Sequence, residues 1–300
     1  MTLRKNKSKL MRLMEKSDNE LVTKFAFQAA KIAIGYYRIL AKYKKKNTYE
    51  REKVLRKYVR KKLAILRNAE LISQAQYKFC VNCPGFETTS FETVLKKQKK
   101  KKFQLCNRNY CLFCHARIVI GIFRKLANML KNNPFSYVWC SKHEVPFSLQ
   151  DFATFQQAMK NPLLTANTIL KYAQRRGDFS FCYGGFIFIW PKLVYNKPNT
   201  GVVCANAIGI GENPNLYFKH GRLSVTNLSE EEQREKWIMS LKILAKLLGE
   251  SAQLPKWLYF SRKNSTTIIM KKFMSNQRTL VRFGTFRGKS NNSNRSLTDE

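Results

Sequence analysis

The chain has 300 residues, enough for one large domain or two small ones, and 44% of them are hydrophobic. Its charge is very unbalanced, with 56 Lys and Arg against 19 Asp and Glu, a formal net charge of +37. A compact chain this positive repels itself unless a polyanion neutralises it, which makes nucleic acid the leading partner and an anionic membrane surface the second. No run of eighteen apolar residues occurs, so no membrane span is expected, and the basic N-terminus lacks the apolar segment of a secretory signal.

Residues 1–70 are predicted to form a basic helical arm. Apolar residues recur at helical spacing within 21–41, and a second helix is expected over 49–69. Its apolar stripe consists of Val54, Tyr58, Leu63 and Leu66. Such helices either pack one face on the core and expose the other to solvent, or they contact the phosphates along a nucleic acid. We expect these helices to do both in part.

Residues 71–134 are predicted to form a cysteine module that ends in a helix. Eight cysteines are too few for a disulfide scaffold in a chain of this length, and their clustering indicates metal in a reducing intracellular compartment, the bacterial cytoplasm or an organelle. Zinc takes four ligands, and two thiolates spaced C-x2-C reach one ion from a tight turn. Five candidate ligands compete for the four positions: Cys80, Cys83, Cys106, Cys111 and Cys114. His115 is expected to cap the following helix rather than to bind the metal.

A run of lysines between the two cysteine pairs cannot pack inside a protein and is predicted to lie on an exposed loop. With two arginines near the cysteines, these lysines are the candidate nucleic-acid-binding residues. The set consists of Lys96, Lys97, Lys99, Lys100, Lys101, Lys102, Arg108 and Arg117.

Residues 135–288 are predicted to form an α+β domain with an antiparallel sheet. Strands are expected at 135–140, at 179–190 with a kink at Gly184 and Gly185, and at 202–210. Helices are expected over 148–176 and from Ser229, where a capping box starts a helix that Gly249 is expected to end. The order strand–helix–strand–strand–helix favours this class over a βαβ array. Residues 289–300 are rich in Ser and Asn and are predicted to be disordered.

The cysteine pattern resembles that of the replication initiators of small rolling-circle plasmids. The segment Cys106-x4-Cys111-x2-Cys114-x2-Arg117 is similar to a knuckle that leads, in that family, into a helix and the first strand of the nicking domain, although Leu112 stands where a proline is common. Four later segments match that family in order: 137–140, 184–196, 217–237 and 277–286. The resemblance implies an HUH endonuclease-like domain that binds a plasmid origin. In an active member, a divalent metal and a tyrosine nucleophile nick and rejoin DNA.

The chain departs from this family at the strand that carries the metal-binding residues of the nicking centre. The family holds Mg²⁺ or Mn²⁺ with a His-hydrophobic-His pair on one face of a strand, since alternate residues point the same way. The corresponding strand, 202–210, has no histidine and carries Cys204 and Asn206 two residues apart. A thiol and a carboxamide are poor ligands for hard cations, so Mg²⁺ or Mn²⁺ is expected only if the nicking centre survives. Tyr259 is the nearest candidate nucleophile, and its aromatic neighbours favour a core or base-stacking role.

The sequence therefore predicts a replication-initiator-like DNA-binding protein with structural zinc and an altered or lost nicking centre. The alternative is a non-enzymatic RNA-binding or ribosome-associated zinc protein. Basic helices, a zinc knuckle and aromatic strands serve RNA equally well.

Overall fold

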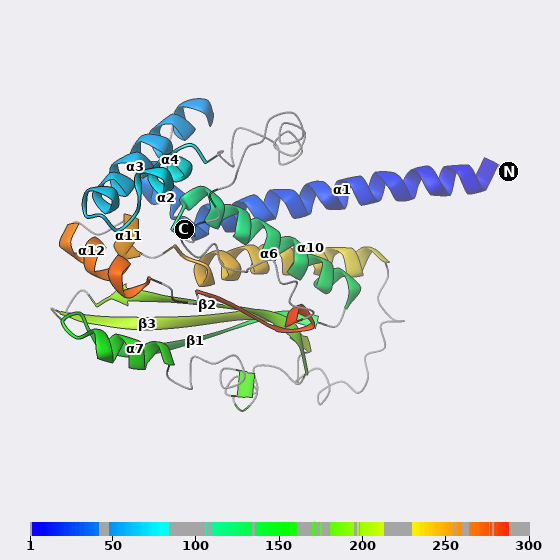
Figure 1. Cartoon of the computed structure of the whole chain (residues 1–300). Coiled ribbons are helices and arrows are strands. Elements are labelled where there is room, and N and C mark those ends of the chain that lie inside the picture. Colours follow the sequence, from blue (N-terminus) through cyan, green and yellow to red (C-terminus); the bar gives the residue numbers. More distant parts are fainter. Residues whose placement is uncertain are drawn as a thin grey trace.

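A computed structural model of the chain describes residues 2–41, 48–83, 106, 108, 110–133, 136–160, 170–171, 175, 181–194, 197, 199–212, 230–254, 256–259, 264–275, 277 and 279–287. The predicted α+β class with an antiparallel sheet is confirmed. Figure 1 shows that α6 and α10 cover one face of the sheet, that α1 lies over them, and that α7 lies against the opposite face. Among the described residues, no helix is both long enough and apolar enough to cross a membrane.

The sheet has four strands in the order β1-β3-β2-β4, and every neighbouring pair is antiparallel. The strands are β1 (Ser136–Ser148), β2 (Phe181–Leu193), β3 (Thr200–Glu212) and β4 (Leu280–Gly284). The strand β3 is central and pairs along its length with β1 and β2. The register of β2 shifts between Cys182 and Gly184, which confirms the kink predicted there.

Most of the helices expected from apolar periodicity are present. They are α1 (Thr2–Ala33), α2 (Tyr36–Ile39), α3 (Thr48–Asn68), α4 (Gln74–Val81), α6 (Leu112–Asn132), α7 (Phe152–Lys160), α10 (Glu230–Ser251), α11 (Lys256–Tyr259) and α12 (Asn264–Phe273), with a 3-10 turn η4 (Thr285–Arg287). The helix predicted over 21–41 is interrupted at Gly35, whose left-handed φ of 63° ends α1 and starts α2. Ser229 and the tail 289–300 lie outside the described residues.

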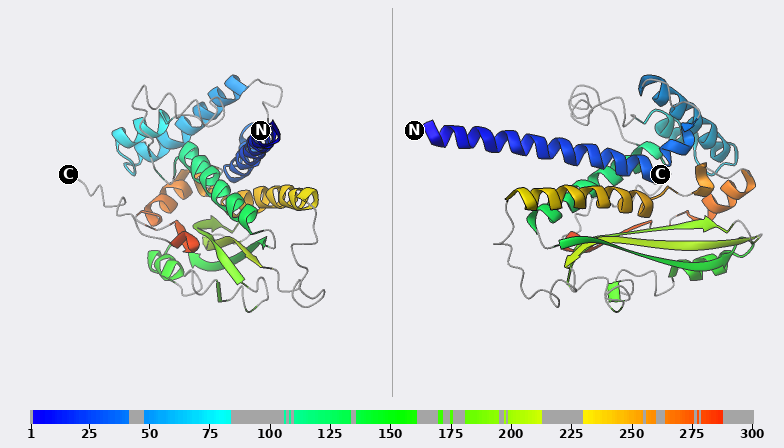
Figure 2. Two further views of the ribbon diagram at one scale, coloured as in Figure 1. Left: turned by 90° about the vertical axis from the view of Figure 1, so that its right-hand side faces the viewer. Right: turned by 180° about the vertical axis from the view of Figure 1, so that it is seen from behind.

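The N-terminal helix is packed into the protein over its second half. Four alanines, Ala26, Ala29, Ala30 and Ala33, are almost fully buried, and α1 contacts both α6 and α10. The N-terminal end of the same helix projects beyond the rest of the molecule (Figure 2). One continuous cluster of buried residues includes side chains from α1, α3, α6 and the sheet, so the units predicted at 1–70, 71–134 and 135–288 share a core.

Gly249 lies inside α10, so the prediction that it ends this helix is wrong. A Cβ atom at this position would lie 2.6 Å from Cβ of Ile32 and 2.9 Å from the carbonyl oxygen of Ala29. The glycine therefore allows α1 and α10 to approach closely, and α10 continues to Ser251.

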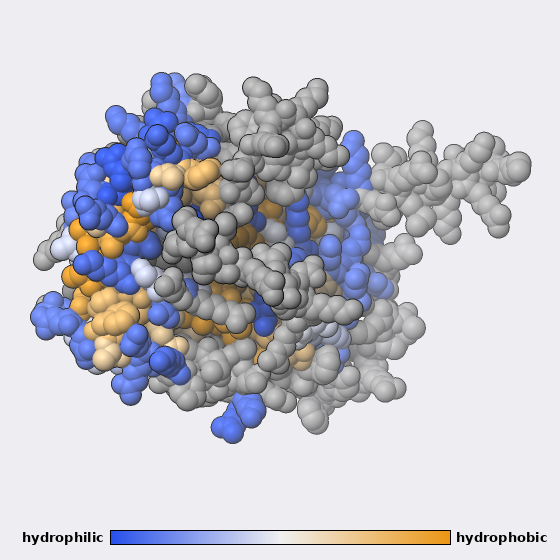
Figure 3. All heavy atoms as spheres, in the orientation of Figure 1, coloured by the Kyte–Doolittle hydropathy of each residue, from blue (hydrophilic) through white to orange (hydrophobic). Residues whose placement is uncertain are grey.

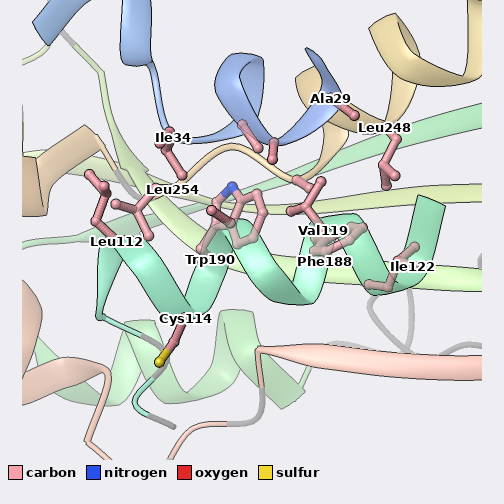
Figure 4. Close-up of a cluster of buried hydrophobic side chains, with 14 of the residues drawn as sticks. Ala29, Ile34, Leu112, Cys114, Val119, Ile122, Phe188, Trp190, Leu248 and Leu254 are labelled. Carbon is pink, nitrogen blue, oxygen red and sulfur yellow. The ribbon is translucent and has the colours of Figure 1, made fainter. Parts of the chain in front are cut away.

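The helix α6 connects this helical layer to the sheet. One face of α6 carries Val119 and Ile122, which lie beside Phe188 and Trp190 of β2 (Figure 4). Cys114, in the first turn of the same helix, points away from these apolar side chains. The helix therefore packs one face on the core and presents a thiol on another.

Candidate metal centre

Four cysteines meet where α4 ends and α6 begins. Cys83 follows α4, Cys111 is the N-cap residue of α6, Cys114 lies in its first turn, and Cys106 comes from the segment before it. Their four sulfur atoms lie within 4.8 Å of one another. A tetrahedral ion with metal–sulfur bonds of about 2.3 Å places its sulfur ligands about 3.8 Å apart. The Sγ atom of Cys114 lies 3.5 Å from that of Cys83 and 3.3 Å from that of Cys106, so the four thiols could hold one metal ion.

The two helices that supply these ligands are fixed by local contacts. A capping box starts α4, in which the Ser73 hydroxyl accepts from the Gln76 amide and the Gln76 side chain accepts from the Ser73 amide, each at 3.1 Å. Arg56 of α3 donates a 3.0 Å hydrogen bond to the carbonyl of Cys83, and its guanidinium lies over the Phe113 ring. The end of α4 is therefore held against α3 and α6.

The thiols of the cluster share hydrogen bonds that favour the thiolate form of Cys106. Cys111 and Cys114 lie at the N-terminus of α6, where the positive end of the helix dipole stabilises negative charge. Hydrogen bonds from Cys111 and Cys114 lower the pKa of Cys106, and the same hydrogen bonds with Cys106 raise the pKa values of Cys111 and Cys114. Arg117 donates to the Cys83 sulfur at 3.7 Å. Four thiolates around a divalent cation carry a net charge of −2, which this arginine partly offsets.

Cys80 is the fifth candidate ligand, and it stays outside the group of four. It is fully buried in α4, and a hydrogen bond with Cys106 is the main reason that its pKa is raised to about 12. A protonated thiol at this position can donate to a ligand sulfur. The sequence alone could not identify the spare cysteine, because Cys80 and Cys83 have the same spacing pattern.

Of the predicted nucleic-acid-binding residues, the structure describes Arg108 and Arg117. The lysine run from Lys96 to Lys102 lies outside the described residues. Arg117 is half-buried against Cys83, so its charge serves the metal centre. Arg108 is exposed. The pKa of Lys271 is lowered mainly by the burial of its own side chain and also by the positive charge of Arg108.

Tyr259 is enclosed beside the metal centre. Its side chain is fully buried, its hydroxyl donates a 2.9 Å hydrogen bond to the Tyr110 carbonyl, and its ring stacks on Tyr58 at 6.1 Å. Burial raises the pKa of Tyr259 well above its ordinary value. In this arrangement the Tyr259 hydroxyl is enclosed and bound to the backbone carbonyl of the residue before Cys111, so its contacts support a structural role.

The central strand β3 carries Cys204 and Asn206 on the face toward α10. The amide of Asn206 donates to the carbonyl of Ser251 at 3.2 Å, and the Cys204 thiol donates to Glu144 at 3.5 Å. Of the three histidines, His115 is buried with Nε2 2.6 Å from the Ala252 carbonyl oxygen. His143 lies on β1, and His220 is outside the described residues. Within the part of the chain that the structure describes, the four-cysteine cluster is the one group of three or more potential metal ligands.

Comparison of the chain with protein-family models, with curated proteins and with solved structures finds no match.

Proposed function

We propose that the chain is a replication-initiator-like DNA-binding protein with structural zinc and an altered or lost nicking centre. The observation that carries DNA binding is the exposed basic face of α3. Lys53, Lys57, Arg60 and Lys61 are exposed and recur at helical spacing, so they share one side of the helix. Figure 3 shows hydrophilic residues gathered over this part of the molecule. Cations aligned in this way can contact several phosphates of one nucleic acid.

The opposite face of α3 keeps these cations in place. Leu55, Val59, Leu63 and Leu66 are at most 1% exposed. Arg56 joins the helix to Cys83, one of the four clustered cysteines. A metal ion in the cluster would therefore fix α3 before DNA binds, which reduces the entropy lost on binding.

Zinc is the metal that we propose for this centre. Four cysteine thiolates in a closed tetrahedral set are typical of structural zinc, whereas Mg²⁺ and Ca²⁺ prefer oxygen ligands. The ion would be held by Cys83, Cys106, Cys111 and Cys114, and it would stabilise the junction of α4 and α6.

The absence of histidine from β3 supports an altered nicking centre. In the initiators that the sequence resembles, this strand supplies two metal-binding histidines, and here it presents Cys204 and Asn206. The enclosure of Tyr259 supports the same proposal. The chain would hold an origin without cutting it.

The test is a binding titration of the purified full-length chain with a labelled stem-loop and a labelled duplex, repeated over a range of salt concentrations. The double variant Lys57→Gln/Lys61→Gln is expected to weaken binding and to reduce the slope of log affinity against log salt by about 2, since each phosphate contact contributes about 0.9. The matched control, Lys242→Gln/Lys246→Gln, removes the same charge from exposed positions on α10 and should change the slope little.

The same titration with structured RNA separates the two functions considered. A preference for RNA of about tenfold or more, roughly 1.4 kcal/mol, would favour the RNA-binding alternative. A salt-independent affinity for both nucleic acids would overturn the proposal.

A further inference from the structure

The cysteine cluster has one thiol more than a tetrahedral ion can bind. Cys83, Cys106, Cys111 and Cys114 form the group of four, and Cys80 lies beside this group with a hydrogen bond to Cys106. A structural zinc site is closed by four ligands, so the Cys80 thiol stays free when the ion is bound. The fifth thiol is therefore a buried nucleophile that the proposed metal centre does not use.

The position of Cys80 differs from that of an ordinary buried cysteine. Free cysteines are often buried as small apolar residues, and their neighbours are then unrelated to their sulfur chemistry. Cys204 on β3 is an example in this chain, since its thiol donates to Glu144. The hydrogen-bond partner of Cys80 is instead the sulfur of a candidate metal ligand. Two sulfur atoms that lie in contact can be joined by oxidation.

Cys106 is the member of the cluster that lies nearest the surface. The other four residues are buried, whereas Cys106 is half-buried. Its sulfur is enclosed with those of the other three ligands, which favours a small oxidant over a large one. Hydrogen peroxide is small and reacts with thiolates rather than with thiols. The Cys106 thiolate is thus the ligand that this oxidant meets first.

We propose that Cys80 and Cys106 form a peroxide-sensitive pair, whose oxidation to a disulfide removes Cys106 from the metal centre and releases the ion. In the first step, the Cys106 thiolate displaces hydroxide from hydrogen peroxide and becomes a sulfenic acid. In the second step, the Cys80 sulfur attacks the Cys106 sulfur and the S–O bond breaks. The leaving hydroxide takes the Cys80 proton and becomes water. Hydrogen peroxide accepts the two electrons that the two sulfur atoms lose.

This pairing rests on the zinc of the proposed function and adds a response to oxidant. Arg56 of α3 donates a hydrogen bond to the carbonyl of Cys83, a ligand that stays behind when Cys106 is lost. Release of the ion should free the end of α4 and remove part of the support of the basic face of α3. Oxidation should therefore weaken DNA binding, and a thiol reductant with added zinc should restore it.

The test begins with the zinc content of the reduced full-length chain, followed by a stoichiometric amount of hydrogen peroxide. A chromophoric chelator measures the released zinc, and mass spectrometry of alkylated, unreduced peptides identifies the first disulfide. We expect a disulfide between Cys80 and Cys106 and release of about one zinc ion per chain. The competing product joins two ligands, Cys106 and Cys114, whose sulfur atoms lie 3.3 Å apart. A first disulfide between these or any other two cysteines would overturn the pairing.

A variant of the fifth thiol tests its role directly. Cys80→Ser keeps a hydrogen-bond donor beside Cys106 but cannot form the disulfide, so it should retain zinc before oxidation. With excess peroxide, its Cys106 should pass from sulfenic to sulfinic acid, which a thiol reductant does not reverse. The wild type should regain its Cys106 thiol after reduction, because the disulfide protects it. Equal recovery of the Cys106 thiol in the two proteins would contradict the role given to Cys80.

Cys140→Ser is the matched control, because it removes an exposed thiol on β1. It should leave the disulfide, the zinc release and the recovery of Cys106 unchanged. The disulfide map of the wild type needs no variant, so it decides the question even if Cys80→Ser fails to fold.

The zinc content before oxidation separates the two proposals. A reduced chain purified without zinc would overturn the proposed zinc site and this pairing together. A zinc-loaded chain that keeps its ion in peroxide, or releases it without a disulfide between Cys80 and Cys106, would overturn this pairing alone. The salt titration of the reduced chain with Lys57→Gln/Lys61→Gln tests DNA binding through α3 independently of both.

Discussion

The hydroxyl of Tyr259 donates a hydrogen bond of 2.9 Å to the backbone carbonyl of Tyr110, the residue before the first cysteine of α6. The Tyr58 hydroxyl donates in turn to the Tyr259 carbonyl. Helices α3 and α11, which are about 200 residues apart in the sequence, are thereby joined beside the cysteine cluster. The contact ties the C-terminal part of the chain to the candidate metal centre.

The change Tyr259→Phe should destabilise the protein and leave DNA affinity almost unchanged. It removes the donor but keeps the ring, so the buried Tyr110 carbonyl loses its partner at a cost of about 1–2 kcal/mol. Denaturant unfolding measures this cost. Tyr37→Phe, at a side chain 62% exposed, is the control and should change the free energy of unfolding by less than about 0.5 kcal/mol.

The same variant decides whether Tyr259 is a nucleophile. Incubation of the wild-type chain with a labelled stem-loop and Mn²⁺ should give no covalent protein–DNA adduct. An adduct that forms with the wild type and is missing with Tyr259→Phe would contradict the structural role assigned to this tyrosine.

Metal analysis of the purified chain should find about one zinc ion per chain, held by four of the five clustered cysteines. Cys111→Ser should release the ion and unfold the junction of α4 and α6, because Cys111 is one of the four clustered thiols. Cys80→Ala is the matched variant, since Cys80 is buried in the same cluster but stands outside the group of four, and it should retain the ion. A Cys80→Ala protein without zinc would show that the ligands are assigned incorrectly.

The carboxyl group of Glu144 should titrate below its ordinary pKa of 4.5, chiefly because Lys142 donates a hydrogen bond to it. A carboxyl with a lowered folded-state pKa contributes stability that is present above its unfolded pKa and is lost as the pH falls through the folded value. NMR of the Glu144 side chain measures this titration directly. Lys142→Met should raise the Glu144 pKa, and Lys242→Met should leave it unchanged. Equal Glu144 pKa values in the wild type and in Lys142→Met would refute this coupling.

Periodicity and cysteine spacing predicted a large part of this architecture. The helices α3 and α10, the strand β3 and the kink in β2 follow from local patterns that tertiary packing reinforces. The C-x2-C pairs indicated the metal centre, because two thiols at this spacing can reach one ion from a tight turn. The strand β4 was missed, since five residues carry too little alternation to stand out.

Long-range contacts explain what local patterns could not predict. The choice of Cys83 over Cys80 depends on where α4 ends against α3 and α6, and the enclosure of Tyr259 depends on α3, α11 and Tyr110 meeting. The hydrogen bond from Asn206 to Ser251 joins residues about 45 positions apart. None of these relationships leaves a local signal in the sequence.

Gly249→Ala tests the close packing of α10 against α1, which the sequence did not predict at this glycine. The added Cβ would meet Ile32 and the backbone of Ala29, so α1 must shift away from α10, at a cost of about 1–3 kcal/mol. Gly121→Ala in α6 is the matched control, because nothing lies within 4 Å of its added Cβ. That change should stabilise the helix by about 0.5–1 kcal/mol, since alanine loses less backbone entropy than glycine. Thermal and denaturant unfolding of the two variants should therefore move in opposite directions, and a Gly249→Ala protein as stable as the wild type would contradict the close approach of α1 and α10.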